Sequence, residues 1–259
     1  MNDSSFASER LRRSAQFPNL SHMRIRAIGW IAGLVSAFLL VGVVRAGDSA
    51  LEVGETDAQG WTLIYEKDGV KAFRRSSDDS ILHEFKGQAV IKANFHKVLA
   101  VYLDAARSSE WVSDCVESRV LPAFPPYDQI TYNRTELPWP LKDRDFVYGE
   151  RYTFDAKRGF FENKMKSVEH PAQAEVTDVV RGVLVSSGFI AQYIDENTTW
   201  VEMRVHTDPK GSIPTSVVNS VTRKWPYESM RDLRHRVLTV TGYDEREQAM
   251  RKRFPLTVQ

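Results

Sequence analysis

The sequence has little cysteine: Cys115 is the only thiol among 259 residues. A single thiol cannot form an internal disulfide, and it cannot supply the four thiolates of a structural metal site. As a nucleophile it would need a base brought beside it by the fold. An inert buried thiol is therefore the simpler interpretation.

The sequence also has no excess of positive charge. It contains 35 Lys and Arg against 34 Asp and Glu, a formal net charge of +1. Binding to a phosphate backbone relies on a clearly basic surface, so we expect no nucleic acid among the partners. The content of 42% hydrophobic and 27% charged residues is that of a folded chain rather than a disordered one.

Motifs of common enzyme classes are missing. There is no G-x-S-x-G nucleophile elbow, no G-x-x-x-x-G-K phosphate loop and no H-E-x-x-H zinc motif. The six histidines are scattered: His22, His83, His96, His170, His206 and His235. We therefore expect no bound metal, no cofactor and no catalytic residue set.

Only one long apolar run is present. Ile28 to Val44 contains no ionisable residue, two arginines precede it, and the small residue Ala46 follows it. These features predict a secretory signal peptide over residues 1–46 and an exported, periplasmic protein. Because the run is slightly shorter than the roughly 20 residues of a spanning helix, an uncleaved inner-membrane anchor facing the periplasm is the alternative. Met23 offers a second start site.

The remainder of the chain is predicted to form one domain, residues 47–245, followed by a charged tail over 246–259. Residues 47–259 carry 29 basic and 32 acidic side chains, a net charge of about −3. Steady attachment to anionic lipid through a basic surface is therefore not expected, because each basic contact contributes only about 1 kcal/mol.

Strand patterns occur in two groups. Trp61–Lys67 and Val70–Arg75 are joined by Asp68-Gly69, a strong hairpin signal, and Leu82–Ile91 predicts a third strand. Asn94 is suited to cap a helix whose apolar side consists of Phe95, Val98, Leu99 and Tyr102. Six further strands are expected at about 116–123, 128–137, 145–155, 159–168, 181–194 and 199–206. Consecutive strands of this kind predict an antiparallel sheet.

A final helix is predicted to open at Pro214, a residue favoured in first turns. Its apolar side comprises Val217, Val218, Val221, Trp225, Met230, Leu233 and Val237. Pro226 falls inside this pattern, where the missing N–H favours a bend. Such a bend is either the hinge of a lid or a fixed kink over a curved sheet.

Two segments resemble a known family. LPWPLKDRDFVYGERY at Leu137–Tyr152 and DPKGSIPTSVVNSVTRKWPYESMRDLRHRV at Asp208–Val237 resemble the START (StAR-related lipid transfer) domain, over roughly Gly47 to Thr241. Together with the signal-like start, the chain resembles bacterial members. The resemblance implies an α+β helix-grip fold, in which a curved antiparallel sheet of about nine strands surrounds a long C-terminal helix. It also implies an internal lipid cavity gated by that helix and the loop 137–144.

One strand carries a carboxylate among aromatic residues. Phe146, Tyr148, Glu150, Tyr152 and Phe154 share a face under the period-two rule. If that face points inward, Glu150 needs a partner, because an unpaired buried charge is costly.

Arg134 on the preceding strand is the candidate partner, and sterol-binding START domains resemble this arrangement with the signs reversed. Three interpretations of the pair stay open: a polar anchor for the ligand, a structural ion pair, or two solvated residues. The resemblance further implies that Met203, Val217, Val221 and Trp225 line the cavity.

The gate loop contains Trp139 between two prolines, followed by Leu141. An exposed tryptophan there would enter the membrane interface during transient contact, whereas a buried one would close the cavity or pack under the final helix. We expect a non-enzymatic carrier or sensor of one lipid or similar hydrophobic molecule. The alternatives are a helix-grip enzyme of cyclase or hydrolase type that uses Glu150 as acid or base, and an adaptor with a solid interior.

Overall fold

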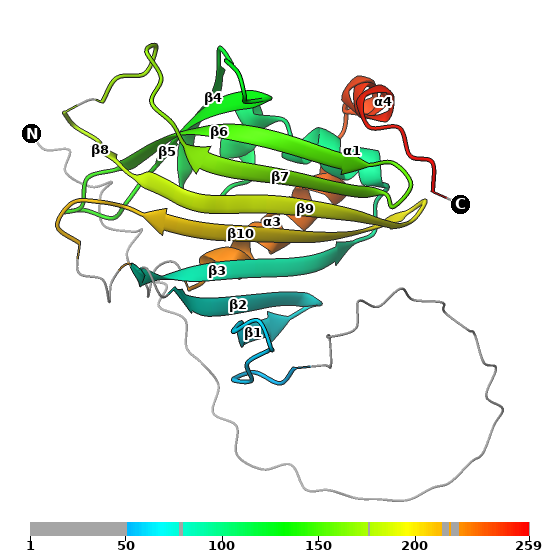
Figure 1. The fold of residues 1–259 in the computed structure, drawn as a ribbon, viewed down its shortest axis with the longest axis horizontal. Coiled ribbons are helices and arrows are strands. Elements are labelled where there is room, and N and C mark those ends of the chain that lie inside the picture. Colours follow the sequence, from blue (N-terminus) through cyan, green and yellow to red (C-terminus); the bar gives the residue numbers. More distant parts are fainter. Residues whose placement is uncertain (1–50, 78–79, 176, 214–217, 219–222, 259) are drawn as a thin grey trace, which may run out of the picture. The chain divides into compact units, whose positions relative to one another are not determined.

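The computed structural model describes residues 51–258 except 78–79, 176, 214–217 and 219–222 (Figure 1). The predicted leader, residues 1–46, lies outside the described residues, as do Pro214, Val217 and Val221. Within the described ranges, no helix combines the length and the apolar character needed to cross a bilayer.

A single sheet dominates the domain. Its strands run in the order β1-β2-β3-β10-β9-β7-β6-β5-β4, and neighbours along this path are antiparallel. The strands are β1 Thr62–Lys67, β2 Val70–Ser77, β3 Ser80–Ile91, β4 Cys115–Leu121, β5 Gln129–Thr135, β6 Arg144–Asp155, β7 Phe160–Ser167, β8 Val180–Arg181, β9 Val183–Asp195 and β10 Thr198–Asp208. The predicted nine-stranded antiparallel sheet is confirmed. The additional strand, β8, has two residues and pairs in parallel with β6.

The predicted first hairpin is also confirmed. Asp68 and Gly69 connect β1 to β2 with φ values of 52° and 72°. A two-residue hairpin turn with positive φ at both positions matches the twist of its strands, and it favours Asp-Gly for this reason.

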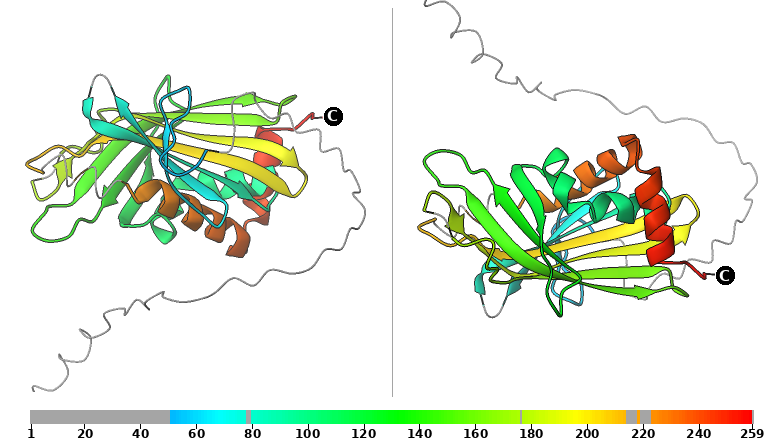
Figure 2. Two further views of the ribbon diagram at one scale, coloured as in Figure 1. Left: turned by 90° about the horizontal axis from the view of Figure 1, so that it is seen from below. Right: turned by 90° about the horizontal axis from the view of Figure 1, so that it is seen from above.

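Helices cover one face of the sheet (Figure 2). They are α1 Phe95–Tyr102, α3 Trp225–Thr239 and α4 Asp244–Arg253, and a short 3₁₀ helix spans Ala105–Glu110. The side chain of Asn94 accepts a hydrogen bond from the Lys97 backbone N–H at 2.9 Å and caps α1, as predicted. We call the helix-covered face of the sheet the inner face.

The main core lies between the inner face and the helices. Phe161 and Phe189 of the sheet pack in one cluster with Phe95 and Leu99 of α1 and Leu233 of α3. These side chains are completely or almost completely buried. Burial of this apolar surface is the main force that holds the helices on the sheet.

The C-terminal region differs from the expectation in two ways. Pro226 is not inside a continuous helix: α3 begins at Trp225 after a turn, so Pro226 occupies the first turn, where no N–H bond is required. Residues 219–222, which precede this turn, lie outside the described residues, so the predicted bend of the helix stays a prediction. Most of helix α4, Asp244–Arg253, falls within the expected charged tail over 246–259, and its Met250 lies in the core with the following Phe254.

Candidate functional site

Strand β6 places a carboxylate on the inner face. Tyr152 and Phe154 pack against the main core, whereas Val147 belongs to a separate cluster with Ile130 on the opposite, outer face. Because side chains alternate along a strand, Glu150 shares the inner face with Tyr148 and Tyr152. The predicted common face of these residues is confirmed, and the interpretation of Glu150 as a solvated, outward-facing residue is wrong, since it is only 4% exposed.

Four side chains donate hydrogen bonds to Glu150. Its Oε1 accepts from the Thr131 hydroxyl at 2.6 Å and from Gln129 Nε2 at 3.0 Å. Its Oε2 accepts from Asn163 Nδ2 at 2.7 Å and from the Tyr152 hydroxyl at 3.2 Å. We call Glu150 and these four donors the Glu150 network. Four donors fully satisfy a buried carboxylate without a cation.

Burial raises the pKa of Glu150 above its ordinary value, although the hydrogen bonds from Thr131, Asn163, Gln129 and Tyr152 act in the opposite direction. The desolvation of the charge is therefore the larger effect. The same carboxylate and burial raise the pKa of the Tyr152 hydroxyl far above its usual range.

The predicted ion pair between Glu150 and Arg134 does not form. Register places Arg134 opposite Asp145, five positions before Glu150 on β6. The Arg134 Nε lies 3.9 Å from carboxylate oxygens of both Glu117 and Asp143. Arg134 and Asp145, the residue opposite it, alternate onto the outer face, whereas the register brings Gln129 opposite Glu150 on the inner face.

A different ion pair is buried nearby. Asp145, only 1% exposed, accepts hydrogen bonds from Arg181 Nε at 2.8 Å and Nη2 at 2.9 Å. The Asp145 carboxylate raises the pKa of Arg181. This paired contact fastens the two-residue strand β8 to β6.

The network extends to helix α1 through Asn163. Asn163 Nδ2 also donates to the Tyr102 hydroxyl at 3.0 Å, and that hydroxyl donates to Met165 Sδ at 3.8 Å. The Tyr102 ring stacks on Phe189 with 3.7 Å between ring centroids. Tyr102 was expected only to fill the core, but its polar end also completes this network.

Sequence reasoning missed Gln129, Thr131 and Asn163. The sequence does contain a pattern that indicates Gln129 and Thr131. These two residues and Asn133 are polar and occupy alternate positions of β5. Such alternation indicates a polar stripe on one face. Asn163 is a single polar residue between Phe161 and Met165 on the inner face of β7, and no pattern identifies its partners.

Part of the inner face next to the network remains accessible. Phe146, Tyr148, Met165 and Ser187 are half-buried. The Tyr148 hydroxyl nevertheless has a pKa raised well above its usual value by burial. Within the described ranges, the buried atoms Asn163 Oδ1 and Ser187 Oγ have no hydrogen-bond partner.

Of the other predicted lining residues, Met203 is buried and Trp225 is half-buried. Met203 is buried in the main core, opposite Gly87 of β3, and Trp225 packs against the same core at the start of α3. Val217 and Val221 lie outside the described residues.

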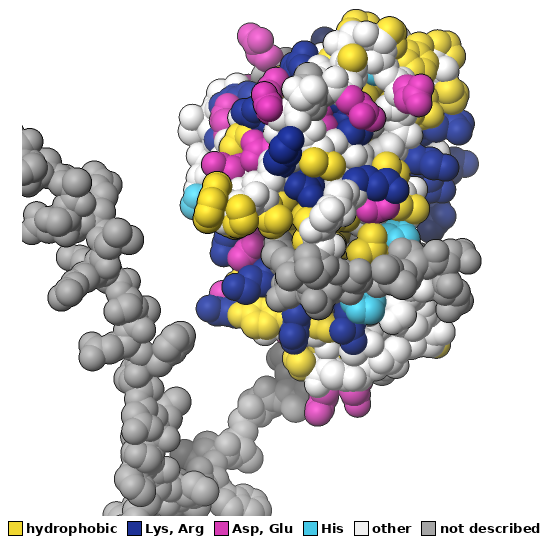
Figure 3. Space-filling view, turned by 90° about the vertical axis from the view of Figure 1, so that its left-hand side faces the viewer, with side chains coloured by type: hydrophobic (Ala, Val, Ile, Leu, Met, Phe, Trp, Pro, Cys, Tyr) yellow, Lys and Arg dark blue, Asp and Glu magenta, His cyan; other side chains and the backbone are white. Residues whose placement is uncertain are grey.

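The predicted gate residues occupy different environments. Trp139 is 92% exposed, Leu141 is half-buried and Pro226 is buried. Trp139 therefore neither caps the interior nor packs under the final helix. On the face drawn in Figure 3, hydrophobic side chains are interspersed with basic and acidic ones.

Arg144 connects the gate loop to a second loop. Its guanidinium donates to the carbonyl oxygens of Pro209 at 2.9 Å and Lys210 at 3.1 Å, and also to that of Lys142. Arg144 is buried, and this burial lowers its pKa. It thereby holds the loop after β10 against the loop before β6.

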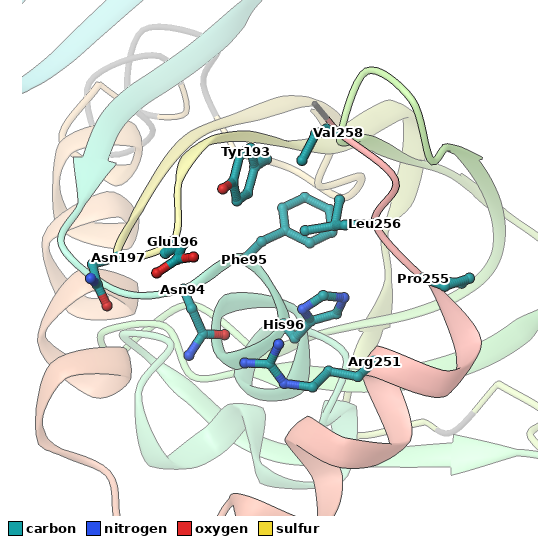
Figure 4. Close-up of a pocket in the computed structure, with 10 residues that line it drawn as sticks. All are labelled: Asn94, Phe95, His96, Tyr193, Glu196, Asn197, Arg251, Pro255, Leu256 and Val258. Atoms are coloured by element: carbon teal, nitrogen blue, oxygen red, sulfur yellow. The ribbon is translucent and has the colours of Figure 1, made fainter.

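Two surface cavities lie away from the Glu150 network. One of about 600 Å³ has walls from the start of α1, the β9–β10 turn and the end of the chain (Figure 4). The other, of about 560 Å³, lies along β1, β2 and β3. Neither contains a predicted lipid-binding residue. Among the described residues, no group of three or more His, Cys, Asp or Glu is placed to hold a metal.

Several known proteins are similar to this chain. An uncharacterized protein of Pseudomonas aeruginosa is 28% identical over 181 residues, which cover 70% of this chain and 88% of that protein. The mouse phosphatidylcholine transfer protein is 23% identical over 176 residues, 67% of this chain and 81% of its own length. A match to mouse START domain-containing protein 10 spans 60% of that protein.

The fold is also similar to that of solved START-domain structures. The crystal structure of human STARD10 superposes with a TM-score of 0.65 at 23% identity, covering 78% of this chain and 84% of that chain. The family model for the START domain matches residues 48–240. The inner face, the helices that cover it and this match together show that the chain belongs to the START domain family, a family of lipid-binding and lipid-transfer proteins.

Proposed function

We propose that this protein encloses one lipid, or a similarly hydrophobic molecule, against the accessible part of its inner face, for transfer or for sensing. The observation that carries the proposal is the Glu150 network, a fully hydrogen-bonded carboxylate on the inner face beside the half-buried side chains of Phe146, Tyr148 and Met165. Apolar surfaces with a few placed polar groups are typical of ligand sites.

Carrying a lipid in this way requires no covalent reaction. Each CH₂ removed from water contributes about 0.8 kcal/mol, and a membrane offers the tail the same stabilisation. The transfer of a lipid between membrane and protein is therefore nearly balanced in free energy. The protein keeps the tail out of water while the lipid moves. The Glu150 network would orient the polar end of the cargo.

The gate and the membrane contact belong to the same proposal. The loop 137–144 would open the site together with the C-terminal helix, and the exposed Trp139 would enter the interface during a transient contact. The small net charge of residues 47–259, about −3, suits brief rather than permanent attachment to anionic lipid.

We further propose that the chain is exported to the periplasm, either with cleavage of residues 1–46 or with that segment kept as an inner-membrane anchor. The support is the apolar run Ile28–Val44 behind two arginines. Fractionation of bacteria that express the full chain, with the N-terminus of the product sequenced, distinguishes a periplasmic product, an anchored product and a cytoplasmic one.

Identification of the cargo tests the central proposal. The full chain, purified without added lipid, is examined by native mass spectrometry, and its solvent extract is analysed for lipids. We expect one lipid per protein. Protein that carries no lipid and takes none up from mixed vesicles would contradict the proposal.

A matched pair of variants locates the site. Ser187→Phe places a bulky ring on the inner face beside Met165, whereas Ser186→Phe places the same ring on the exposed outer face of β9. We expect Ser187→Phe to abolish lipid occupancy and Ser186→Phe to retain it, with unfolding curves confirming that both variants fold. Equal occupancy would place the lipid elsewhere.

An enzyme that uses Glu150 as acid or base is the second candidate, favoured by the raised pKa of that carboxyl. Each Glu150 oxygen already accepts two hydrogen bonds from protein donors, so proton transfer to a substrate would first have to displace one. Recovery of the bound lipid with an unchanged mass after long incubation supports carriage, and a product that fails to form with Glu150→Gln supports catalysis.

A further inference from the structure

We infer that Asn163 Oδ1 and Ser187 Oγ form a subsite for a lipid group that donates a hydrogen bond, such as a hydroxyl, an amide N–H or an ammonium group, and that phosphate is not accepted there. This inference rests on the proposed function and specifies its ligand class. Both atoms are buried, and neither has a hydrogen-bond partner among the residues that the structure describes.

The orientation of the Asn163 amide is set by its neighbours. Its nitrogen donates to the Glu150 carboxylate and to the Tyr102 hydroxyl, which directs its own proton to Met165. Turning the amide over would place its oxygen against the carboxylate. Asn163 is 0% exposed, so its oxygen is a buried acceptor without a donor, an arrangement that costs free energy unless a ligand or water fills it.

Ser187 faces the same space from the next strand. Register pairs Asn163 with Phe189 and Met165 with Ser187, so Asn163 and Ser187 are diagonal neighbours on the inner face. Diagonal positions of an antiparallel pair are about 7–8 Å apart, a distance that one small polar group can bridge by contacting both side chains. Ser187 retains accessible surface, as a residue at the edge of a binding site should.

The charge of the surroundings selects the ligand. The Glu150 carboxylate lies next to Asn163, and no ion pair to Glu150 forms in the part of the chain that the structure describes. Arg144, on the same face of β6, donates to three backbone carbonyls. A phosphate would therefore meet the Glu150 anion and the Asn163 carbonyl oxygen with only the Ser187 hydroxyl to donate to it, whereas a hydroxyl or amine would supply the proton that Asn163 Oδ1 lacks.

Three lipids with identical tails test the inference: dioleoylglycerol, its 3-O-methyl ether and dioleoyl phosphatidic acid. They compete for the full-length, lipid-free protein, and native mass spectrometry measures their relative occupancy. We expect dioleoylglycerol to exceed the ether by about threefold to tenfold, the effect of one hydrogen bond, and to exceed phosphatidic acid by more. Ser187→Ala should reduce the preference for the alcohol over the ether.

Ser187→Ala removes no hydrogen bond within the protein, so it should fold normally, and Ser186→Ala on the exposed side of β9 is its control. Equal binding of alcohol and ether, or a preference for phosphatidic acid, would overturn the inference while leaving lipid binding intact. An unchanged preference in Ser187→Ala would also overturn it. Failure of all three lipids to bind, with no lipid in the purified protein, would overturn the proposed function itself.

Discussion

Gly87 of β3 lies directly beneath Pro226 of α3. A Cβ atom built on Gly87 would be 2.4 Å from the Pro226 carbonyl oxygen and 2.7 Å from Cγ of Met230. The backbone oxygen cannot move aside as a flexible side chain can, so the approach of α3 to the sheet depends on the absence of a side chain at this position. The residue at position 87 therefore sets how closely the C-terminal helix covers the inner face.

Replacement of Gly87 should loosen that contact. We expect Gly87→Ala to lower the free energy of unfolding by about 1–3 kcal/mol, the usual cost of overpacking, because the first turn of α3 must shift. Urea denaturation measures the change. Ser186→Ala, at an exposed strand position, is the control and should change stability by less than about 0.5 kcal/mol. A Gly87→Ala protein as stable as the wild type would show that the helix start can move at no cost.

The buried pair of Asp145 and Arg181 should matter more for stability than Arg134 does. We expect Asp145→Asn to cost about 3 kcal/mol, because it leaves the largely buried Arg181 without its counter-charge. Arg134→Ala should cost less than about 1 kcal/mol, since its ion pairs are long and about a third exposed. Urea denaturation of both variants compares them, and a larger loss in Arg134→Ala would contradict the assignment.

Stability should depend on pH through Glu150. Because burial raises its pKa, the folded protein binds this proton more tightly than the unfolded chain. The contribution of Glu150 to stability is therefore greatest at low pH and decreases as the pH rises from its ordinary pKa to its raised one. The Glu150→Gln variant lacks this titration.

The free energy of unfolding of the wild type minus that of Glu150→Gln should accordingly decrease as the pH rises above about 4.5, the ordinary pKa of a glutamate. Most other titrations cancel in this difference. A difference that increased with pH would mean that the four donors outweigh desolvation and lower the pKa of Glu150.

Trp139 should act in membrane docking and not in folding. Because its side chain is almost fully exposed, Trp139→Ala should leave the urea midpoint unchanged. Co-sedimentation with phosphatidylcholine and phosphatidylglycerol vesicles should weaken by about tenfold or more, the value of one large apolar side chain. Ile194→Ala, an exposed apolar residue at the far end of β9, is the control. Equal docking of wild type and Trp139→Ala would remove this residue from the membrane contact.

Alternation along strands could be read from the sequence because it is local. The common face of Tyr148, Glu150 and Tyr152 follows from their spacing alone. The partner of Glu150 could not be read in this way. It depends on the register between β5 and β6, which the geometry of the intervening loop sets, and that register puts Gln129 rather than Arg134 beside the carboxylate.

Helix α4 could not be predicted from the sequence for a different reason. Its ten residues include few apolar ones, so no amphipathic stripe marks it. The structure of α1 explains why a further helix is needed. Most residues of α1 are buried, so α1 must contact another part of the chain in addition to the sheet. Met250 and Phe254 provide part of that cover. Tertiary packing, not local pattern, decides such a segment.

Arg144 makes two distant parts of the chain mechanically dependent on each other. Pro209 and Lys210 follow it by 65 and 66 positions, yet the same guanidinium that holds them also holds Lys142. A displacement of either loop must break these bonds or carry the other loop along. Separation of these two loops would thus be a concerted event, because one side chain holds both of them.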